Sequence, residues 1–224
     1  FDYNSYYIGI GSTGPIGDRI TYGVEAAYEG GDTLSNSFVV GGPFLSPIAQ
    51  TRDDISAWAA DARIDYLFPD ERRSRLSGEV IIASGDSDRL NTSNTFGGNA
   101  PNTKDKAFNA FGLLNTGLAF APAVSNLIAF RVGGSTFPLP DTGALRRFQI
   151  GTDVFLYNKF DADAPIDELT SGQSFLGWEP DFYLNWQMTS DVTLVVRYGI
   201  FFPSDAFPSE DSRQYIYGGV TYAF

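Results

Sequence analysis

Short and long connections alternate along this chain, and the alternation restricts its fold more than any single motif does. Four short connections, rich in turn residues, are Pro15–Asp18, Phe68–Arg73, Leu139–Ala144 and Met188–Asp191. Four long polar connections lie between them, at about Gly31–Asp54, Asp86–Asn126, Asp161–Trp178 and Pro203–Ser212. Transmembrane β-barrels have short turns at one end and long loops at the other, so the pattern favours a barrel. A soluble sandwich or jelly roll has no reason to place every long loop at one end.

Between these connections, polar and apolar residues alternate with the period of two that is typical of β-strands. The alternation predicts nine strands: Tyr3–Ser12, Arg19–Gly30, Ile55–Phe68, Arg75–Gly85, Leu127–Pro138, Arg146–Phe160, Glu179–Thr189, Val192–Phe202 and Arg213–Phe224. We therefore expect an all-β fold, an antiparallel transmembrane β-barrel that forms a single domain over residues 1–224. The apolar segment Phe108–Pro122 is expected to be a loop folded into the mouth or the lumen, because one more strand would break the alternation.

The composition limits the chemistry that the chain can perform. Its 224 residues include neither Cys nor His. Without His there is no Ser-His-Asp or Cys-His site and no His-ligated zinc or iron, so we expect no enzyme, cofactor or metal. A formal net charge of −12 argues against nucleic acid as a partner. No apolar run approaches the about 20 residues that a membrane-spanning helix needs. Barrel strands are not excluded, because polar and apolar residues alternate in them and their mean hydropathy hides the apolar face.

The two faces of the predicted strands differ in charge. In Val192–Phe202, for example, Val196 and Tyr198 share an apolar face, while Arg197 lies on the other. Placing Arg or Lys at the bilayer midplane costs about 2–4 kcal/mol, so the uncharged face is expected to meet lipid. The charged face needs water, because several unpaired charges are not tolerated in an apolar core. The candidate lumen-lining residues are Arg63, Asp65, Arg75, Glu79, Arg131, Arg147, Asp153, Lys159, Glu179, Asp181, Arg197 and Arg213.

These interleaved charges have two possible roles, which are compatible with each other. They can form cross-strand ion pairs that stiffen the wall, or they can present a field that selects solutes. We expect pairs between Asp65 and Arg75, and between Arg197 and either Asp181 or Glu179. In a soluble sandwich the same charges would simply face bulk solvent.

The last ten residues, Tyr215–Phe224, alternate an apolar stripe with a mixed face and end on an aromatic residue. This pattern resembles the C-terminal signature of bacterial outer-membrane barrels, in which a final Phe is read by the barrel-assembly machinery. The resemblance implies that this machinery is a partner of the C-terminal strand.

The order of several motifs over about Arg75–Phe224 resembles the alginate export family of outer-membrane porins. The motifs are ASGD (Ala83–Asp86), FNAFG (Phe108–Gly112), the asparagine-leucine pair Asn126–Leu127, GWEPDFYL (Gly177–Leu184), RYGIFFPSDAF (Arg197–Phe207) and the terminal aromatic strand. The resemblance implies the bacterial outer membrane as location, its lipid and lipopolysaccharide as surroundings, and a hydrophilic solute or polysaccharide as cargo. Barrels of this family have about 18 strands, so nine strands would be the C-terminal portion of a longer chain.

Family members that export alginate have a basic lumen, whereas basic and acidic candidates are nearly balanced here. Two alternatives to a porin therefore stay open: a plugged structural or adhesive barrel, and a soluble secreted β-sandwich that binds carbohydrate. The acidic segment Phe160–Leu169 offers oxygen ligands for Ca²⁺ but lacks the EF-hand spacing, which favours a solvated loop. Glu179 and Asp181 share a strand face, and a charge ladder explains them better than glycoside chemistry does.

Overall fold

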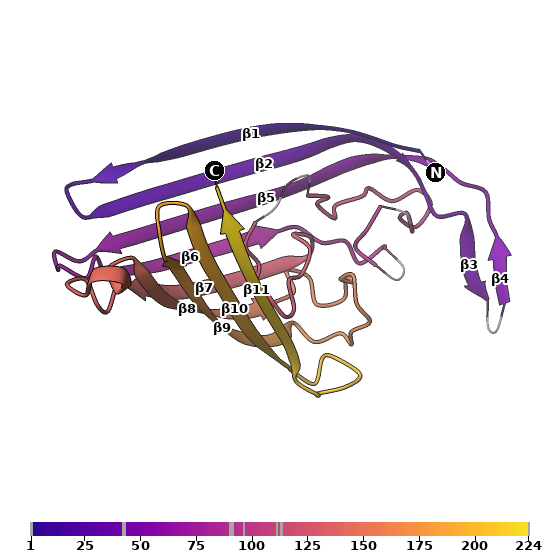
Figure 1. Ribbon diagram of the computed structural model, residues 1–224. Helices are drawn as coiled ribbons and strands as arrows, with labels where there is room; N and C mark the ends of the chain where they lie inside the picture. The colour runs from indigo at the N-terminus through magenta and orange to yellow at the C-terminus, as the bar shows by residue number, and fades with distance from the viewer. Residues whose placement is uncertain are drawn as a thin grey trace.

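Nine β-strands form one antiparallel sheet in chain order, as the alternation predicts (Figure 1). The structure is a computed structural model that describes residues 2–41, 44–89, 92–95, 97–110, 112 and 114–223, with the backbone alone for 39–41 and 44–45. The strands are β1 (Tyr3–Ile16), β2 (Ile20–Leu34), β5 (Arg52–Leu67), β6 (Arg75–Ala83), β7 (Leu127–Thr136), β8 (Phe148–Asn158), β9 (Phe175–Gln187), β10 (Val192–Pro203) and β11 (Arg213–Tyr222). In the described part, β1 pairs only with β2 and β11 only with β10, so the sheet is open.

The predicted strands are all present, and their bounds differ most in β1, β2, β5 and β9, by three or four residues at one end. β1 and β2 extend to Ile16 and Leu34, because their pairing continues without interruption from one end to the other. β9 begins at Phe175 rather than at Glu179, and its early part contains Gly177 at φ +141°. A Cβ at Gly177 would lie 2.3 Å from the backbone oxygen of Phe202, so only glycine fits between these strands. The terminal aromatic residue Phe224 lies outside the described residues.

The connections sort by length into the two ends of the sheet (Figure 1). Residues 17–19, 68–74, 137–147 and 188–191 link strands at the short-turn end, where η1 (Gly143–Leu145) also lies. Residues 35–51, 84–126, 159–174 and 204–212 link strands at the long-loop end. The first long connection contains a hairpin that the alternation does not predict, β3 (Phe38–Gly41) and β4 (Phe44–Pro47), which projects away from the sheet.

The connection between β6 and β7 folds onto the concave side of the sheet, which agrees with the prediction of a loop for its described residues. Among its described residues it forms isolated bridges but no strand. Phe108, Phe120 and Val124 from this connection are buried against the inner wall. The predicted Phe108–Pro122 loop includes Phe111 and Leu113, which lie outside the described residues.

Large apolar side chains cover the opposite, outer face of the sheet. Ile10 is 78 % exposed, Ile216 is 76 % exposed and Val220 is 68 % exposed. In the described part the only other sheet is the β3–β4 hairpin, so no second layer covers this face. A soluble sandwich would bury such a face against a second sheet, and the described residues form none that does so. No helix in the described ranges is long and apolar enough to cross a membrane.

Candidate functional site in the inner wall

Ion pairs occupy the half of the inner wall that lies toward the short turns. Arg131 of β7 stands directly opposite Glu79 of β6, and its guanidinium lies 2.6 Å from the Glu79 carboxylate. Asp153 of β8 approaches the same guanidinium from the other side at 3.8 Å. The side chains of Arg131 and Glu79 are each 9 % exposed, so each charge is stabilised mainly by the other. These residues alternate with outward apolar ones, which is why three neighbouring strands bring them together.

A second group of charges centres on Asp65 of β5. Its carboxylate accepts hydrogen bonds from Arg75 of β6 at 2.6 Å and from Arg63 at 3.1 Å. The pair of Asp65 and Arg75 that the sequence predicts is therefore present. The short turn 68–74 brings the two residues together, because Asp65 stands opposite Ser77 in the register of β5 and β6 and Arg75 begins β6. Together with Arg131, Glu79 and Asp153, these three residues form what we call the ionic belt.

Glycines on neighbouring strands leave room for the carboxylates of Asp153 and Asp181. A Cβ at Gly133, opposite Asp153, would lie 1.8 Å from an Asp153 oxygen. A Cβ at Gly199, opposite Asp181, would lie 2.4 Å from an Asp181 oxygen. The carboxylates therefore lie along the wall over glycines instead of standing out from it.

Arg197 makes different contacts from those that the sequence predicts. Its guanidinium donates to the side-chain oxygen of Asn185 at 2.8 Å and to the backbone oxygen of Leu184 at 3.2 Å. The predicted pair with Asp181 or Glu179 is therefore wrong. In the register Arg197 stands opposite Tyr183, with Asp181 two residues to one side and Asn185 two residues to the other, and the guanidinium bonds to Asn185.

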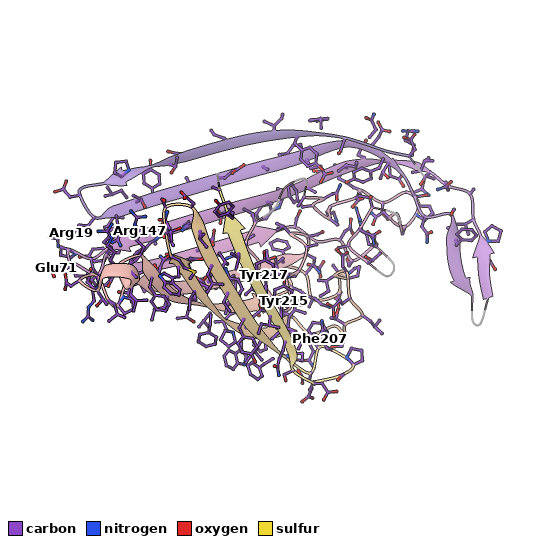
Figure 2. The ribbon with its side chains drawn as sticks, in the orientation of Figure 1. Arg19, Glu71, Arg147, Phe207, Tyr215 and Tyr217 are labelled. Atoms are coloured by element: carbon purple, nitrogen blue, oxygen red, sulfur yellow. The ribbon has the colours of Figure 1, made fainter. Side chains whose placement is uncertain are left out.

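Besides Glu179, Asp181 and Arg197, three further candidate residues lie outside the belt. Arg147 is exposed at the short-turn end (Figure 2). Lys159 follows β8 in the long-loop end, where its ammonium donates to the backbone oxygens of Ala162 at 3.1 Å and Ser171 at 2.6 Å. Burial lowers the pKa of Lys159. Arg213 begins β11, pairs with Glu168 at 2.7 Å and lies over the ring of Phe207.

Glu179 has a role that its strand pattern does not reveal. Its side chain is fully buried, and both carboxylate oxygens point at the inserted connection. The backbone N–H groups of Leu118 and Ala119 donate to its Oε1 at 2.5 and 2.7 Å. The N–H of Phe120 donates to its Oε2 at 2.8 Å. Three donors on one carboxylate explain how an acidic group is accommodated here without a cationic partner.

Glu29 of β2 plays a matching role, and sequence reasoning missed it. It is also fully buried, and its Oε1 accepts hydrogen bonds from the hydroxyls of Tyr3 at 2.7 Å and Tyr7 at 2.9 Å. Its Oε2 accepts the backbone N–H of Asn109 at 2.8 Å. An acidic residue among small inward residues near the long-loop end is the sequence signal that points to it.

An aromatic cluster fills the inner wall beside Glu179. The ring of Phe120 stacks on Phe201 of β10 at 4.3 Å and meets Tyr157 of β8 edge-on at 5.1 Å. The Tyr157 hydroxyl donates to the backbone oxygen of Thr116 at 2.8 Å. On the neighbouring strands several inward positions are small, with Ala57, Ala59, Ala83 and Ala129 all buried beside the larger Ile81 and Leu127. Small residues leave room for the inserted connection, and we call this part of the wall the apolar half.

The acidic segment after β8 does not assemble into a cation site in the described structure. Asp167 accepts the hydroxyls of Thr92 and Ser93, and Glu168 pairs with Arg213. Within the described ranges, no group of three acidic side chains is placed to hold a metal ion. The segment instead ties two long connections to each other.

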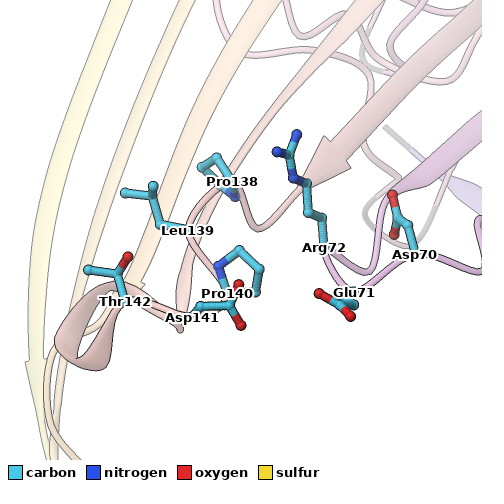
Figure 3. A pocket seen from close by; sticks show the side chains of 8 residues that line it. All are labelled: Asp70, Glu71, Arg72, Pro138, Leu139, Pro140, Asp141 and Thr142. Carbon is cyan, nitrogen blue, oxygen red and sulfur yellow. The ribbon is translucent and has the colours of Figure 1, made fainter.

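The cavities lie at both ends of the sheet. One of about 570 Å³ opens between two turns at the short-turn end and is lined by 70–72 and 138–142 (Figure 3). Another, of about 240 Å³, lies inside the sheet between the wall residues Glu25 and Asp61 and the inserted residues Phe108 and Leu114. The inserted connection therefore does not fill the lumen completely.

Comparison with known proteins agrees with this architecture at the level of the family. Among curated proteins, none matches the sequence. The alginate export family matches residues 2–220, which is almost the whole chain. It is a family of transport channels, and the all-β sheet described above fits an outer-membrane barrel. The chain belongs to the alginate export family.

Proposed function

We propose that this chain forms part of a channel in the bacterial outer membrane, through which a hydrophilic solute or polysaccharide passes. The single observation that carries the proposal is the division of one sheet into an apolar outer face and an ionic inner face. An apolar surface of this extent is unfavourable in water but is what a bilayer stabilises. The inner face requires water, because its charges are only partly neutralised.

The balance of charges in the ionic belt supports a polar pathway without strong preference for one sign. Three guanidinium groups, from Arg63, Arg75 and Arg131, lie beside the carboxylates of Asp65, Glu79 and Asp153. Such a wall presents a field across the lumen in place of a uniformly basic surface. We therefore propose transport of a hydrophilic solute and do not restrict it to alginate.

A catalytic role is not part of the proposal. The carboxylate of Glu179, the best placed acid for glycoside chemistry, is occupied by three backbone N–H groups. A general acid or nucleophile must reach its substrate, and a fully buried carboxylate with both oxygens bonded does not.

Conductance across a planar lipid bilayer tests the proposal directly. The full-length protein, purified in detergent, is expected to give discrete conductance steps, and its reversal potential in a salt gradient reports ion preference. Glu79→Gln should shift that potential toward anions, because it leaves Arg131 less neutralised. Glu210→Gln, an exposed change in the 204–212 loop, is the matched control and should leave it unchanged.

A plugged structural or adhesive barrel is the second candidate, and one observation favours it. The inserted connection packs Phe108, Phe120 and Val124 against the apolar half of the wall. A folded protein that inserts into bilayers and never conducts would support this candidate and contradict the channel.

A further inference from the structure

The inserted connection reaches across the concave side of the sheet and is held at two separated strands. We call residues 105–122 the strap, of which 111 and 113 are not described. Near its start the strap bonds to Glu29 of β2, and near its end it bonds to Glu179 of β9. Four strands, β5, β6, β7 and β8, separate β2 from β9 in the sheet. The strap therefore spans the lumen between two carboxylates of the wall.

Both ends of the strap are held through its backbone. Glu179 takes the N–H groups of Leu118, Ala119 and Phe120, and Glu29 takes that of Asn109. Hydrogen bonds to an ionised carboxylate are about twice as strong as neutral ones. Wall carboxylates thus hold the strap backbone at both positions, in addition to the packing of the Phe108 and Phe120 side chains.

The structure beside Glu179 leaves no room for a side chain at position 117. Gly117 has φ +105°, and a Cβ there would lie 2.3 Å from the Tyr157 hydroxyl and 2.8 Å from Glu179 Oε1. Only glycine adopts this backbone without strain and lets the three following N–H groups converge on one carboxylate. The strap end is shaped to receive this particular side chain.

We propose that Glu29 and Glu179 are positioning residues that hold the strap across the lumen and thereby set how far the channel is open. This inference rests on the proposed channel function. Loss of either carboxylate releases one end of the strap, and the lumen widens at the long-loop end while the ionic belt stays in place.

Glutamine substitutions test each anchor with little change in volume. Glu179 uses both oxygens as acceptors, so the amide nitrogen of Glu179→Gln must face a backbone donor whichever way it turns. Glu29→Gln is the milder change, because the tyrosine hydroxyls on Oε1 can accept from the new amide and only the bond from the Asn109 N–H is weakened by the loss of charge. Each variant should raise the mean single-channel conductance. Glu25→Gln is the matched control, since Glu25 lies on the same face of β2, is exposed, and has no hydrogen bond to the strap in the described structure.

Amide hydrogen exchange gives a second readout that needs no conduction. In Glu179→Gln the amides of 118–120 should exchange at least about tenfold faster, because their acceptor is weakened and the segment opens more often. Amides of the paired strands β6 and β7 should exchange at the wild-type rate.

A disulfide rescue separates positioning from general instability. The chain has no Cys, and a Cβ at Gly199 would lie 2.9 Å from the Cβ of Leu118. A disulfide needs about 3.5–4.5 Å between Cβ atoms, so Leu118→Cys with Gly199→Cys requires a small outward shift and a rotation of the Asp181 carboxylate. In the Glu179→Gln background, oxidation should restore the wild-type conductance and reduction should raise it again. Gly11→Cys with Glu25→Cys, whose Cβ atoms would be 3.7 Å apart in β1 and β2, should have no such effect.

The outcomes distinguish this inference from the channel proposal. Wild-type conductance and exchange rates in both glutamine variants, in a protein that conducts, would overturn the positioning role and leave the channel intact. A protein that never conducts would refute the channel, and the exchange rates at 118–120 would still decide whether Glu179 holds the strap.

Discussion

The two halves of the inner wall differ in the groups that bind their buried charged side chains. Toward the short turns, Arg131 and Asp65 form ion pairs with side chains of neighbouring strands. Toward the long loops, Glu29 and Glu179 are satisfied mainly by tyrosine hydroxyls and by the backbone of the inserted strap. The belt is therefore built by strand register alone, whereas the apolar half is complete only when the strap is in place.

This difference separates the contacts that stabilise the sheet from the contacts that hold the strap on its concave side. Changes in the belt affect partners on adjoining strands and should lower the stability of the whole sheet. Changes in the apolar half should mainly free the strap, because its contacts are made to a connection and not to another strand. The predictions below test this division.

The largest effect is expected from Arg131→Met. The change leaves the carboxylates of Glu79 and Asp153 without their common cation, and breaking a buried pair typically costs about 3–5 kcal/mol. Urea unfolding in lipid vesicles, followed by tryptophan fluorescence, measures the loss. The double variant Arg131→Met with Glu79→Met should lose clearly less than Arg131→Met alone. If the single variant unfolds at the wild-type urea concentration, the belt does not stabilise the sheet.

Neighbouring valines of β10 test which side of the wall meets lipid. Val196→Arg places a guanidinium on the apolar outer face and should cost about 2–4 kcal/mol near the middle of the bilayer. Val195→Arg, one residue earlier, points to the inner face, where water solvates the charge, and should cost much less. Unfolding of the two variants in the same vesicles gives the comparison. Equal losses would contradict the division into a lipid face and a wet face.

Tyr157→Phe tests the apolar half with a smaller change. It removes the hydrogen bond from the Tyr157 hydroxyl to the backbone oxygen of Thr116, worth about 1 kcal/mol, and keeps the ring packed on Phe120. Amide exchange in the strap should become faster, while the urea midpoint of the sheet moves little. A fall in the urea midpoint without faster exchange in the strap would show that the two halves are not independent.

The sequence predicts the sheet well because strand alternation and turn composition are local signals. All nine strands, the loop between β6 and β7 and the pairing of Asp65 with Arg75 follow from them. The partner of Arg197 is not predictable in this way, because Arg197 stands opposite Tyr183, and Asp181 and Asn185 lie two residues to either side of Tyr183 on the same face. The role of Glu29 depends on a backbone N–H contributed from 80 residues further along the chain, which no local pattern encodes.

The smallest effect is expected at Asp70, in the turn that joins the two strands of the Asp65–Arg75 pair. The backbone N–H of Ser74 donates to Asp70 Oδ1 at 2.9 Å, and this hydrogen bond lowers the pKa of Asp70. A folded-state pKa below the unfolded value stabilises the protein above the ordinary pKa of Asp, about 3.9, and the contribution disappears as the pH falls through the folded value. Asp70→Asn should therefore be slightly less stable than the wild type at pH 7. The two proteins should converge once the pH falls below the folded-state pKa of Asp70, where Asp70 is protonated and, like Asn, an uncharged acceptor. Because Asp70 is fully exposed and lies beside the belt but outside it, a large difference at pH 7 would mean that the turn, and not strand register, fixes the ionic half of the wall.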